Sequence, residues 1–292
     1  MNAPSPMLPS ASLDDGTLAS ALASGAAEVL LALRAEVDAS GGSFVAKELK
    51  DAGDAAAQAW LAAALAAARP ADVILSEEAK DDPARLGADR VWIIDPLDGT
   101  REFAERHADG SLAGQWRDDF AVHIALWERG AGLTVGAVAL PARGEVLATR
   151  DGVVPDGEAG VAVLSGSRPL RIAASRSRPP AFVSALAERD DVELVPMGSA
   201  GVKMMAVADG TVDAYVHGGG QYEWDSAAPV AVAWSRGLVC TRLDGSELEY
   251  NRESPWLPDL FVCPPALAQR LRELLDTVGV VSVVGADSKE GA

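Results

Sequence analysis

Three short acidic segments carry the side chains best suited to chemistry. Residues 76–78 (Ser-Glu-Glu) follow an apolar segment, residues 95–100 (DPLDGT) follow another, and residues 224–229 (WDSAAP) open an expected helix. In the middle segment, Asp95 and Asp98 stand on either side of a proline. Two carboxylates in one tight turn repel each other unless a cation lies between them. Hard oxygen ligands without His or Cys suit Mg²⁺, so the pattern favours a magnesium site.

The backbone of the same segment is suited to an anion. Pro96 has no N–H to donate to a ladder, so we expect the strand over residues 91–94 to end here. Gly99 can adopt a positive φ, after which the chain turns into a helix at Thr100 or shortly after. The Leu97 carbonyl can be an additional ligand, and free N–H groups at the helix start attract an anion. The alternative is a strand end followed by an N-cap aspartate and a turn.

The first half of the chain must place two of these segments. Apolar residues recur at helical spacing over residues 18–37, and the Ala-rich stretch 51–68 predicts a second helix that Pro70 ends. Residues 43–50 read as a short extended piece. The remaining elements are expected to be strands in a largely antiparallel sheet with a short helix or turn before the second strand: strands 72–75, 91–94, 120–128, 133–140 and 145–149, and the turn 82–87.

The second half alternates strands and helices, which is typical of α/β structure. The Gly/Pro-rich stretch 151–169 marks the expected boundary, so we divide the chain into an N-terminal α+β half, 1–150, and a C-terminal α/β half, 151–292. The expected strands are 171–174, 192–196, 214–216, 237–241 and 259–263, and the expected helices are 181–189, 200–208, 226–236 and 265–278.

Composition limits the partners. The chain has 292 residues, 49% of them hydrophobic, and a net charge of −18. So acidic a surface repels nucleic-acid phosphates and anionic lipids, so we expect neither partner. An anionic substrate would need local positive charge from metal or arginines. The two cysteines, Cys240 and Cys263, indicate a reducing compartment and buried thiols. Residues 1–16 lack a secretory signal pattern, and the longest apolar run, 59–68, is too short to span a membrane; the expected location is cytoplasmic.

The acidic segments together resemble the signatures of a known family. Residues 92–100 (WIIDPLDGT) look like the first signature of the inositol monophosphatase superfamily, residues 224–229 look like its second, and residues 76–78 stand at the expected place upstream. Within it, the chain looks most like the bacterial CysQ-type branch. The resemblance implies a layered αβαβα fold and hydrolysis of a phosphomonoester with two or three Mg²⁺ ions, inhibited by Li⁺. It also implies removal of the 3′-phosphate of 3′-phosphoadenosine 5′-phosphate (PAP) to give AMP, and a homodimer as a common assembly.

The family's functional residues carry over by motif. Thr100 matches the hydroxyl that helps to activate the attacking water, and Asp54 matches the acidic partner of that hydroxyl. Glu77 is also assigned a catalytic role. This chain reads Asp-Ala-Gly-Asp over residues 51–54 where the family usually has Thr-x-Ala-Asp, so Asp51 is the alternative partner, or only a helix N-cap. The implied metal ligands, with Asp95 bridging two ions, are Glu77, Asp95, the Leu97 carbonyl, Asp98 and Asp225.

The resemblance also implies substrate contacts in the second half. Residues 174–178 look like a segment that contacts nucleotide in the PAP-phosphatase branch, with two arginines for a second phosphate; otherwise they form a solvated basic loop. Residues 198–203 resemble the family's G-S-x-x-x-K stretch, and otherwise form a helix N-cap with an exposed lysine. Residues 218–220, three glycines, let the backbone approach a ligand or form a turn. The expected contacts are Asp98, Gly99, Thr100, Ser175, Arg176, Ser177, Arg178, Ser199, Lys203 and Asp225.

Several alternatives remain at the level of sequence. The same metal site can serve inositol monophosphate or fructose 1,6-bisphosphate. A haloacid-dehalogenase-like phosphatase has a D-x-D-G-T motif, but here the aspartates are at i and i+3 and Asp95 precedes a proline. A non-catalytic member that binds only metal is the third alternative. For His107, His123 and His217 we expect structural roles, and for Asp118 and Asp119 simple exposure.

Overall fold

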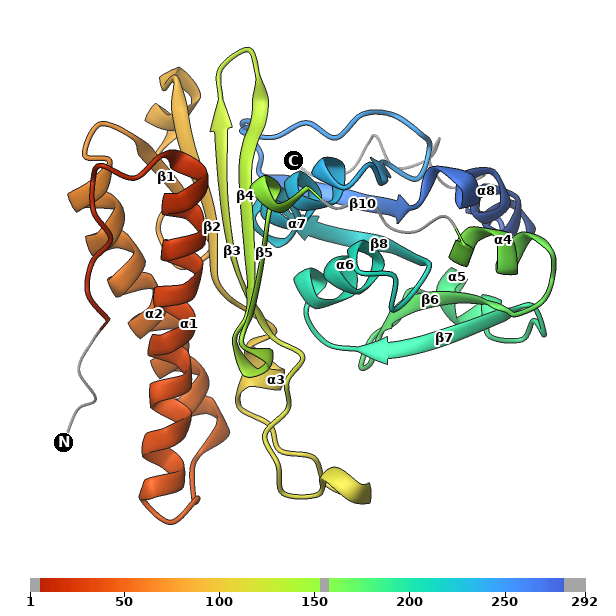
Figure 1. Ribbon diagram of the computed structural model, residues 1–292, viewed down its shortest axis with the longest axis horizontal. Coiled ribbons are helices and arrows are strands. Elements are labelled where there is room, and N and C mark those ends of the chain that lie inside the picture. Colours follow the sequence, from red (N-terminus) through yellow and green to blue (C-terminus); the bar gives the residue numbers. More distant parts are fainter. Residues whose placement is uncertain (1–5, 153–157, 281–292) are drawn as a thin grey trace.

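Two long helices form the first layer of the molecule. The computed structural model describes residues 6–152 and 158–280, and its first elements are α1 (Asp15–Ala39) and α2 (Ala46–Ala68), which lie side by side on one face of a sheet (Figure 1). The extended piece expected at 43–50 is wrong, because α2 begins at Ala46. Residues 46–50 (AKELK) are good helix formers, and Glu48 suits the positive end of the helix dipole.

Helix α1 is long and apolar enough to cross a membrane by length and composition alone. The sequence analysis considered uninterrupted apolar runs and therefore did not identify this helix. Several of its apolar side chains, including Leu18, Leu22 and Leu30, are fully buried in the core that it shares with α2 and the first sheet. The core helix of a globular layer meets the same criterion.

The first sheet has the strand order β1-β2-β3-β4-β5. β1 pairs with β2 in parallel and the other neighbours are antiparallel, as expected. β2 does not end at Pro96 but continues to Asp98 through an irregularity in its pairing with β3, where the proline's missing N–H costs no ladder bond. The strands are β1 (Val73–Ser76), β2 (Arg90–Asp98), β3 (Ala121–Glu128), β4 (Gly132–Leu140) and β5 (Glu145–Ala148).

The second sheet has the order β7-β6-β8-β10-β9, with β6 parallel to β7 and β8 and the other pairs antiparallel. Two strands, β8 and β10, are longer than expected, since Gly218 pairs with Asp259 and the pairing resumes at Gln221 after an irregularity at Gly219 and Gly220. Its strands are β6 (Leu170–Ser175), β7 (Val192–Met197), β8 (Ala214–Tyr222), β9 (Val239–Thr241) and β10 (Trp256–Cys263).

The remaining helices separate and cover the sheets. α6 and α7 lie between the two sheets, and α4, α5 and α8 lie beyond the second, so the layers read αβαβα (Figure 1). α4 interrupts the stretch expected as a boundary, of which residues 153–157 lie outside the described residues; the division into two halves stays a prediction. The helices are α3 (Thr100–Phe103), α4 (Glu158–Leu164), α5 (Ala181–Leu186), α6 (Ala200–Ala208), α7 (Glu223–Ser235) and α8 (Ala268–Thr277), with 3₁₀ turns at Pro83–Gly87, Gly110–Leu112, Pro141–Arg143, Thr149–Asp151 and Pro265–Leu267.

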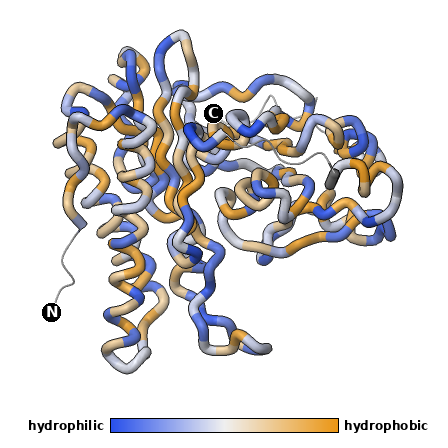
Figure 2. Tube along the Cα trace, viewed as in Figure 1, coloured by the Kyte–Doolittle hydropathy of each residue, from blue (hydrophilic) through white to orange (hydrophobic). Residues whose placement is uncertain are grey.

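Three apolar cores fill the spaces between the layers. Alternate residues of β2 face opposite ways: Trp92 and Ile94 pack on α1 and α2, whereas Val91 and Ile93 face α6 and α7. A third core joins the second sheet to α5 and α8. Figure 2 shows the strands of the first sheet as largely hydrophobic. β2 is therefore buried on both faces, which fixes the strand that ends at the acidic motif.

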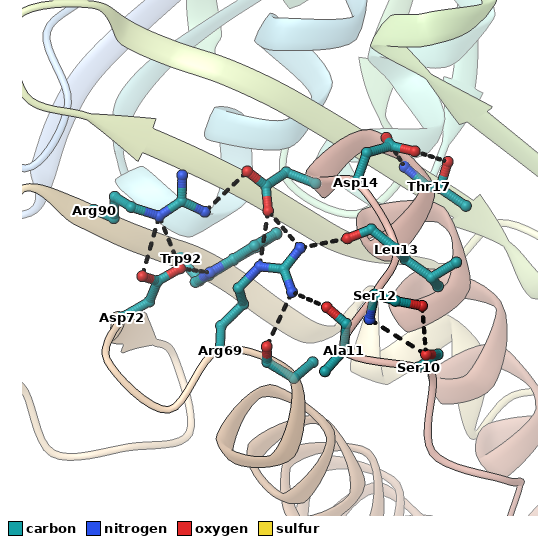
Figure 3. Close-up of polar contacts among 12 residues, drawn as sticks. Ser10, Ala11, Ser12, Leu13, Asp14, Thr17, Arg69, Asp72, Arg90 and Trp92 are labelled. Carbon is teal, nitrogen blue, oxygen red and sulfur yellow. Dashed lines mark hydrogen bonds and ion pairs between the residues drawn. The ribbon is translucent and has the colours of Figure 1, made fainter.

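A polar network anchors the other end of β2. Arg90 donates to Asp72 and, at 2.9 Å, to Asp15, and the Trp92 indole donates to Asp72 at 2.8 Å (Figure 3). Arg69, just after α2, also donates to Asp15. The network ties α1, the end of α2 and the first two strands together, so the position of β2 along its axis is set from both ends.

Candidate active site

Three aspartates converge between the first sheet and α7. Asp95 and Asp98 come from the end of β2, and Asp225 comes from the first turn of α7. Ligand oxygens of all three lie within 4.8 Å of one another, a grouping that can hold a metal ion. Residues far apart in the sequence thus form one carboxylate cluster.

Asp95 is the most deeply buried of the three, with 1% of its surface exposed. Its Oδ1 accepts a hydrogen bond from the Leu97 N–H at 3.0 Å, whereas its Oδ2 is buried without a hydrogen-bond partner among the described residues. Burial, and then the negative charges of Glu77 and Asp98, raise the pKa of Asp95 well above its usual range. A buried carboxylate oxygen without a donor calls for a cation, so the residues fit a metal site.

Asp98 is held as a charged carboxylate. Its Oδ2 accepts hydrogen bonds from the Ser199 hydroxyl at 2.5 Å and the Gly201 N–H at 2.7 Å, and His123 Nε2 lies 3.2 Å away. Burial favours the neutral form, but these donors outweigh it and lower the pKa of Asp98 to about 2. The cluster therefore keeps at least one negative charge.

Asp225 closes the first turn of α7. Its Oδ2 accepts the Tyr222 N–H at 2.6 Å, which fixes the side chain at the N-terminus of the helix. Burial, followed by the charge of Asp98, raises the pKa of Asp225 to about 6. Without a cation, ionising this group beside Asp98 is therefore unfavourable.

Glu77 stands next to the cluster but outside the group of three. Ser76 pairs with Ile94 in the parallel register of β1 and β2, so Glu77 follows at the level of Asp95. Burial of its carboxylate, then the charges of Asp225 and Asp98, raise the pKa of Glu77 to about 7. The electrostatic influence of the cluster thus extends to the position at which the sequence placed a metal ligand.

The turn after β2 holds the expected hydroxyl. Gly99 has φ = 87°, and a Cβ there would lie 3.2 Å from the Asp119 carbonyl oxygen, so glycine is required. Thr100 donates from Oγ1 to the Leu97 carbonyl at 3.2 Å. The helix that follows, α3, is a single turn. Asp98, Gly99 and Thr100, which the sequence analysis assigned to this turn, therefore lie next to one another at the cluster.

Helix α2 brings an acidic residue to this turn. A Cβ at Gly53 would lie 2.9 Å from Leu97 Cδ2, so the helix approaches the motif very closely there. Burial, then the charge of Glu78, raise the pKa of the neighbouring Asp54 to about 7. Asp51 instead forms an exposed ion pair with Lys47 at 2.5 Å. Asp54 and Asp51 thus differ in burial and pairing, and the assignment of Asp54 as the acidic partner of Thr100 stays a prediction.

A pocket of about 620 Å³ opens from the cluster toward the second sheet. Asp98 and Asp225 line one part of it, and β6, α6 and β8 supply most of the rest. Of the residues that the sequence proposed as substrate contacts, those in the pocket lining are Asp98, Ser175, Ser177, Arg178, Ser199, Lys203 and Asp225.

Lys203 is buried rather than an exposed lysine on a helix. Its Nζ donates to the carbonyls of Gly198 at 3.2 Å and Ser199 at 2.5 Å. Burial lowers the pKa of Lys203, while the charges of Asp98 and Glu102 act in the opposite direction. The Ser199 hydroxyl both caps α6 and binds Asp98, so it acts on the carboxylate rather than as an unengaged donor.

Arg176 does not line this pocket. Its guanidinium forms ion pairs with Glu102, at 2.7 Å, and with Glu105, which joins β6 to the turn after β2. A guanidinium paired with two carboxylates has little free charge for a phosphate. The geometry therefore disfavours a direct substrate contact by Arg176 and gives it a role in joining the two sheets.

Two residues that the sequence analysis set aside support the site. Asp119 was expected to be exposed, which is wrong: it is buried, pairs with Arg117, and accepts the Gly198 N–H at 2.7 Å. His123, on β3, lies between Asp98 and Trp224. Its Nδ1 is 3.0 Å from the Trp224 carbonyl oxygen. Only the alternation of β3, which points His123 toward the second motif, could have indicated this; the partner of Asp119 is far away in the sequence.

Comparisons with known proteins identify the relatives of this chain. The model of the inositol monophosphatase family matches residues 15–278. A Mycobacterium leprae protein named 3′-phosphoadenosine 5′-phosphate phosphatase is 48% identical over 268 residues, covering 88% of this chain and 92% of that protein. An Escherichia coli K12 protein named 3′(2′),5′-bisphosphate nucleotidase CysQ is 31% identical over 211 residues, covering 70% and 80%.

Solved structures show the same fold. The crystal structure of inositol monophosphatase-II from Staphylococcus aureus MSSA476 superposes with a TM-score of 0.71 at 17% identity, covering 94% of this chain and 98% of that one. At this identity the likeness concerns the fold, and it agrees with the five layers expected from the signatures. The chain belongs to the inositol monophosphatase family.

Proposed function

We propose that this protein is a Mg²⁺-dependent phosphomonoesterase that removes the 3′-phosphate of PAP to give AMP. The observation that carries the proposal is the buried Asp95 Oδ2, which has no donor among the described residues and lies in a cluster of carboxylates. The PAP phosphatase named above, with 48% identity over most of both chains, supports the choice of substrate.

The cluster supplies hard oxygen ligands, which suit Mg²⁺. Asp95, Asp98 and Asp225 would hold the ions together with Glu77 and the Leu97 carbonyl, and the size of this ligand set suits two or three. Bound Mg²⁺ neutralises phosphoryl oxygens and lowers the pKa of water. It also supplies the local positive charge that an anionic substrate needs on a chain of net charge −18.

Thr100 and Asp54 act on the attacking water in this proposal. Thr100 Oγ1 orients the water, and the Asp54 carboxylate accepts the proton. Its pKa of about 7 suits a base that works near neutral pH. Attack in line with the leaving 3′-oxygen then needs mainly positioning and charge neutralisation.

The second phosphate of PAP is assigned to the cationic side of the pocket. Lys203 and Arg178 both line it, and the hydroxyls of Ser175 and Ser177 lie on the same strand end. Ser175 Oγ accepts the Arg178 N–H at 3.2 Å, which orders the loop. A cytoplasmic location suits the two buried free thiols, Cys240 and Cys263, and the assembly is proposed to be a homodimer.

An Asp95→Asn variant tests the proposal. It should lose phosphate release from PAP and the rise in melting temperature that Mg²⁺ gives to the wild type, because one ligand oxygen becomes an amide nitrogen. Asp89→Asn is the matched control, since that side chain is 89% exposed and forms a surface ion pair with Arg129. Full activity in Asp95→Asn, or trapping of a covalent phosphoenzyme, would overturn the proposal.

A further inference from the structure

Helix α3 carries Thr100 at the site but is too short to keep its conformation unaided. It spans four residues, Thr100–Phe103, and follows Gly99. Isolated helices need about 12 to 15 residues to be even marginally stable in water. The last carbonyls of any helix also lack partners within the helix. The position of the Thr100 hydroxyl therefore depends on the contacts that other elements make with α3.

A buried arginine of α1 binds the end of α3. Arg34 is 3% exposed, and its guanidinium donates from Nε to the Phe103 carbonyl at 2.9 Å and from Nη2 to the Glu102 carbonyl at 3.0 Å. Phe103 in turn donates its N–H to the Gly99 carbonyl at 2.9 Å. Hydrogen bonds thus connect α1, through the single turn of α3, to the residue that precedes Thr100.

The third donor of Arg34 closes the loop that follows α3. Nη1 donates to the Arg117 carbonyl at 2.7 Å, whereas the other two bonds lie at the start of this loop. The loop, residues 104–116, extends beyond the end of the first sheet (Figure 1). An ion pair between Arg106 and Asp38 also joins it to α1. Arg34 therefore holds both ends of one loop, immediately after the helix that carries Thr100.

The charge of Arg34 is compensated without a carboxylate. No ion pair joins Arg34 to an acidic side chain among the described residues, and its three hydrogen bonds all go to main-chain carbonyls. Its guanidinium carbon lies 4.3 Å from the centre of the Phe120 ring and 4.9 Å from that of Trp116, which favours a cation. Burial lowers the pKa of Arg34 to about 10, so the group stays charged at neutral pH. A buried charge is costly unless it is hydrogen-bonded, so these carbonyls are its essential partners.

We propose that Arg34 is a positioning residue for the reaction: its guanidinium holds α3 so that the Thr100 hydroxyl stays in place beside the carboxylate cluster. Arg34 does not line the pocket that contains Asp98 and Asp225, so it acts through α3 and not on the substrate. The inference rests on the proposed function, in which Thr100 orients the attacking water. Loss of Arg34 should therefore lower kcat and leave the binding of substrate and Mg²⁺ unchanged.

The test compares point variants of the full chain on PAP. Arg34→Ala removes all three donors, whereas Arg34→Lys keeps a positive charge but lacks the planar fork. We expect kcat to fall about 100-fold in Arg34→Ala and about 10-fold in Arg34→Lys, because small displacements of a positioning group cause losses of this size. KM, and the dissociation constant of Mg²⁺ measured by calorimetry without substrate, should change less than about twofold.

Arg129→Ala is the matched control. The side chain of Arg129 donates to the carbonyls of Leu86 and Ala88, so it also binds a loop through main-chain oxygens. It follows Glu128, which pairs with Arg90 at the opposite end of β2 from the cluster. Arg129→Ala should therefore keep the wild-type kcat.

Chemical rescue separates positioning from folding. Arg34 lines a second pocket, of about 510 Å³, through which a small cation can reach the space that Arg34→Ala leaves. Methylguanidinium should raise the kcat of Arg34→Ala about 10-fold and saturably, since it returns the donors to the α3 carbonyls. It should not raise the kcat of the wild type or of Arg129→Ala, and sodium chloride at the same ionic strength should have no effect on any of them.

Each outcome decides for or against the inference. A wild-type kcat in Arg34→Ala or Arg34→Lys overturns it, and so does a folded Arg34→Ala that methylguanidinium does not rescue. A loss of Mg²⁺ binding that accompanies the loss of kcat also overturns it, because Arg34 would then support the whole site and not Thr100. If Arg34→Ala does not fold, Arg34→Lys decides by its kcat and its Mg²⁺ binding. If the wild type releases no phosphate from PAP, the proposed function fails and this inference with it, whatever the variants do.

Discussion

Replacing Asp225 with asparagine should stabilise the metal-free protein. The pKa of this carboxyl is about 6 in the folded chain against 3.8 for the free side chain, because of burial and the nearby charge of Asp98. The difference of about 2 units corresponds to about 3 kcal/mol at 1.36 kcal/mol per unit. Asparagine keeps an oxygen for the Tyr222 N–H and has no charge. In the presence of a metal chelator at pH 8, the free energy of unfolding of Asp225→Asn should therefore be about 3 kcal/mol higher than that of the wild type.

The stability difference between Asp225→Asn and the wild type should depend on pH. A carboxyl with a raised folded pKa contributes its full stability below the unfolded value of 3.8, and loses it as the pH rises through about 6. The advantage of Asp225→Asn should thus be near zero at pH 3.8 and complete above pH 6. Urea unfolding in EDTA across this range measures it. Mg²⁺ should reverse the order at pH 8, because only the wild type retains the ligand.

A second aspartate provides the matched control. Asp213 is also shielded from solvent but pairs with Arg168 at 2.6 Å, and hydrogen bonds that it accepts from this arginine and from the Arg171 N–H outweigh burial and lower its pKa. Asp213→Asn should therefore destabilise the protein under the conditions in which Asp225→Asn stabilises it. A chelated Asp225→Asn variant that is less stable than the wild type at pH 8 would refute the reasoning about charge in the cluster.

Three further predictions follow from contacts around the cluster. Ser199→Ala removes the hydroxyl that binds Asp98, so the Mg²⁺ concentration for half-maximal activity should rise about 10-fold; an unchanged metal requirement would count against this bond. Gly201→Ala places a Cβ 2.0 Å from His123 Nε2 and should cost about 1–3 kcal/mol in urea unfolding, whereas a neutral effect would show that α6 can move. Asp54→Asn should lower kcat about 100-fold and abolish the rise of activity through pH 7, while Asp51→Asn keeps both; equal effects would remove the distinction between them.

Most elements of the fold could be predicted from local sequence patterns. The helices over 18–37 and 200–208 and the meander of the first sheet follow from apolar spacing and turn residues, and the structure confirms them. The errors arise where tertiary pairing outweighs a local signal. Pro96 reads as a strand end, yet β2 continues through an irregularity because β3 still pairs with Asp98. Residues 218–220 read as a turn or as a close approach to a ligand, yet they lie within β8, where Gly218 pairs with Asp259 of β10.

Some residues of the site could be predicted from local sequence, and others could not. The carboxylates could be recognised because each stands in a short motif next to an expected strand or helix. The groups that hold them could not, because their partners are distant in sequence: Ser199 and His123 reach Asp98 from α6 and β3, and Asp119 reaches Gly198. The ion pairs of Arg176 with Glu102 and Glu105 could not be predicted for the same reason, because these partners lie more than 70 residues away in the sequence. Burial without a hydrogen-bond partner, as at Asp95 Oδ2, cannot be predicted from the sequence.

The most direct test of the central claim is phosphate release in Mg²⁺ from PAP, inositol 1-phosphate and fructose 1,6-bisphosphate, measured side by side with and without Li⁺. The account predicts a kcat/KM for PAP at least ~100-fold above the other two, about 2.7 kcal/mol of transition-state discrimination, and inhibition by Li⁺. Comparable or reversed values would contradict the assignment of a nucleotide substrate, and an absence of release from all three would contradict the assignment of catalysis.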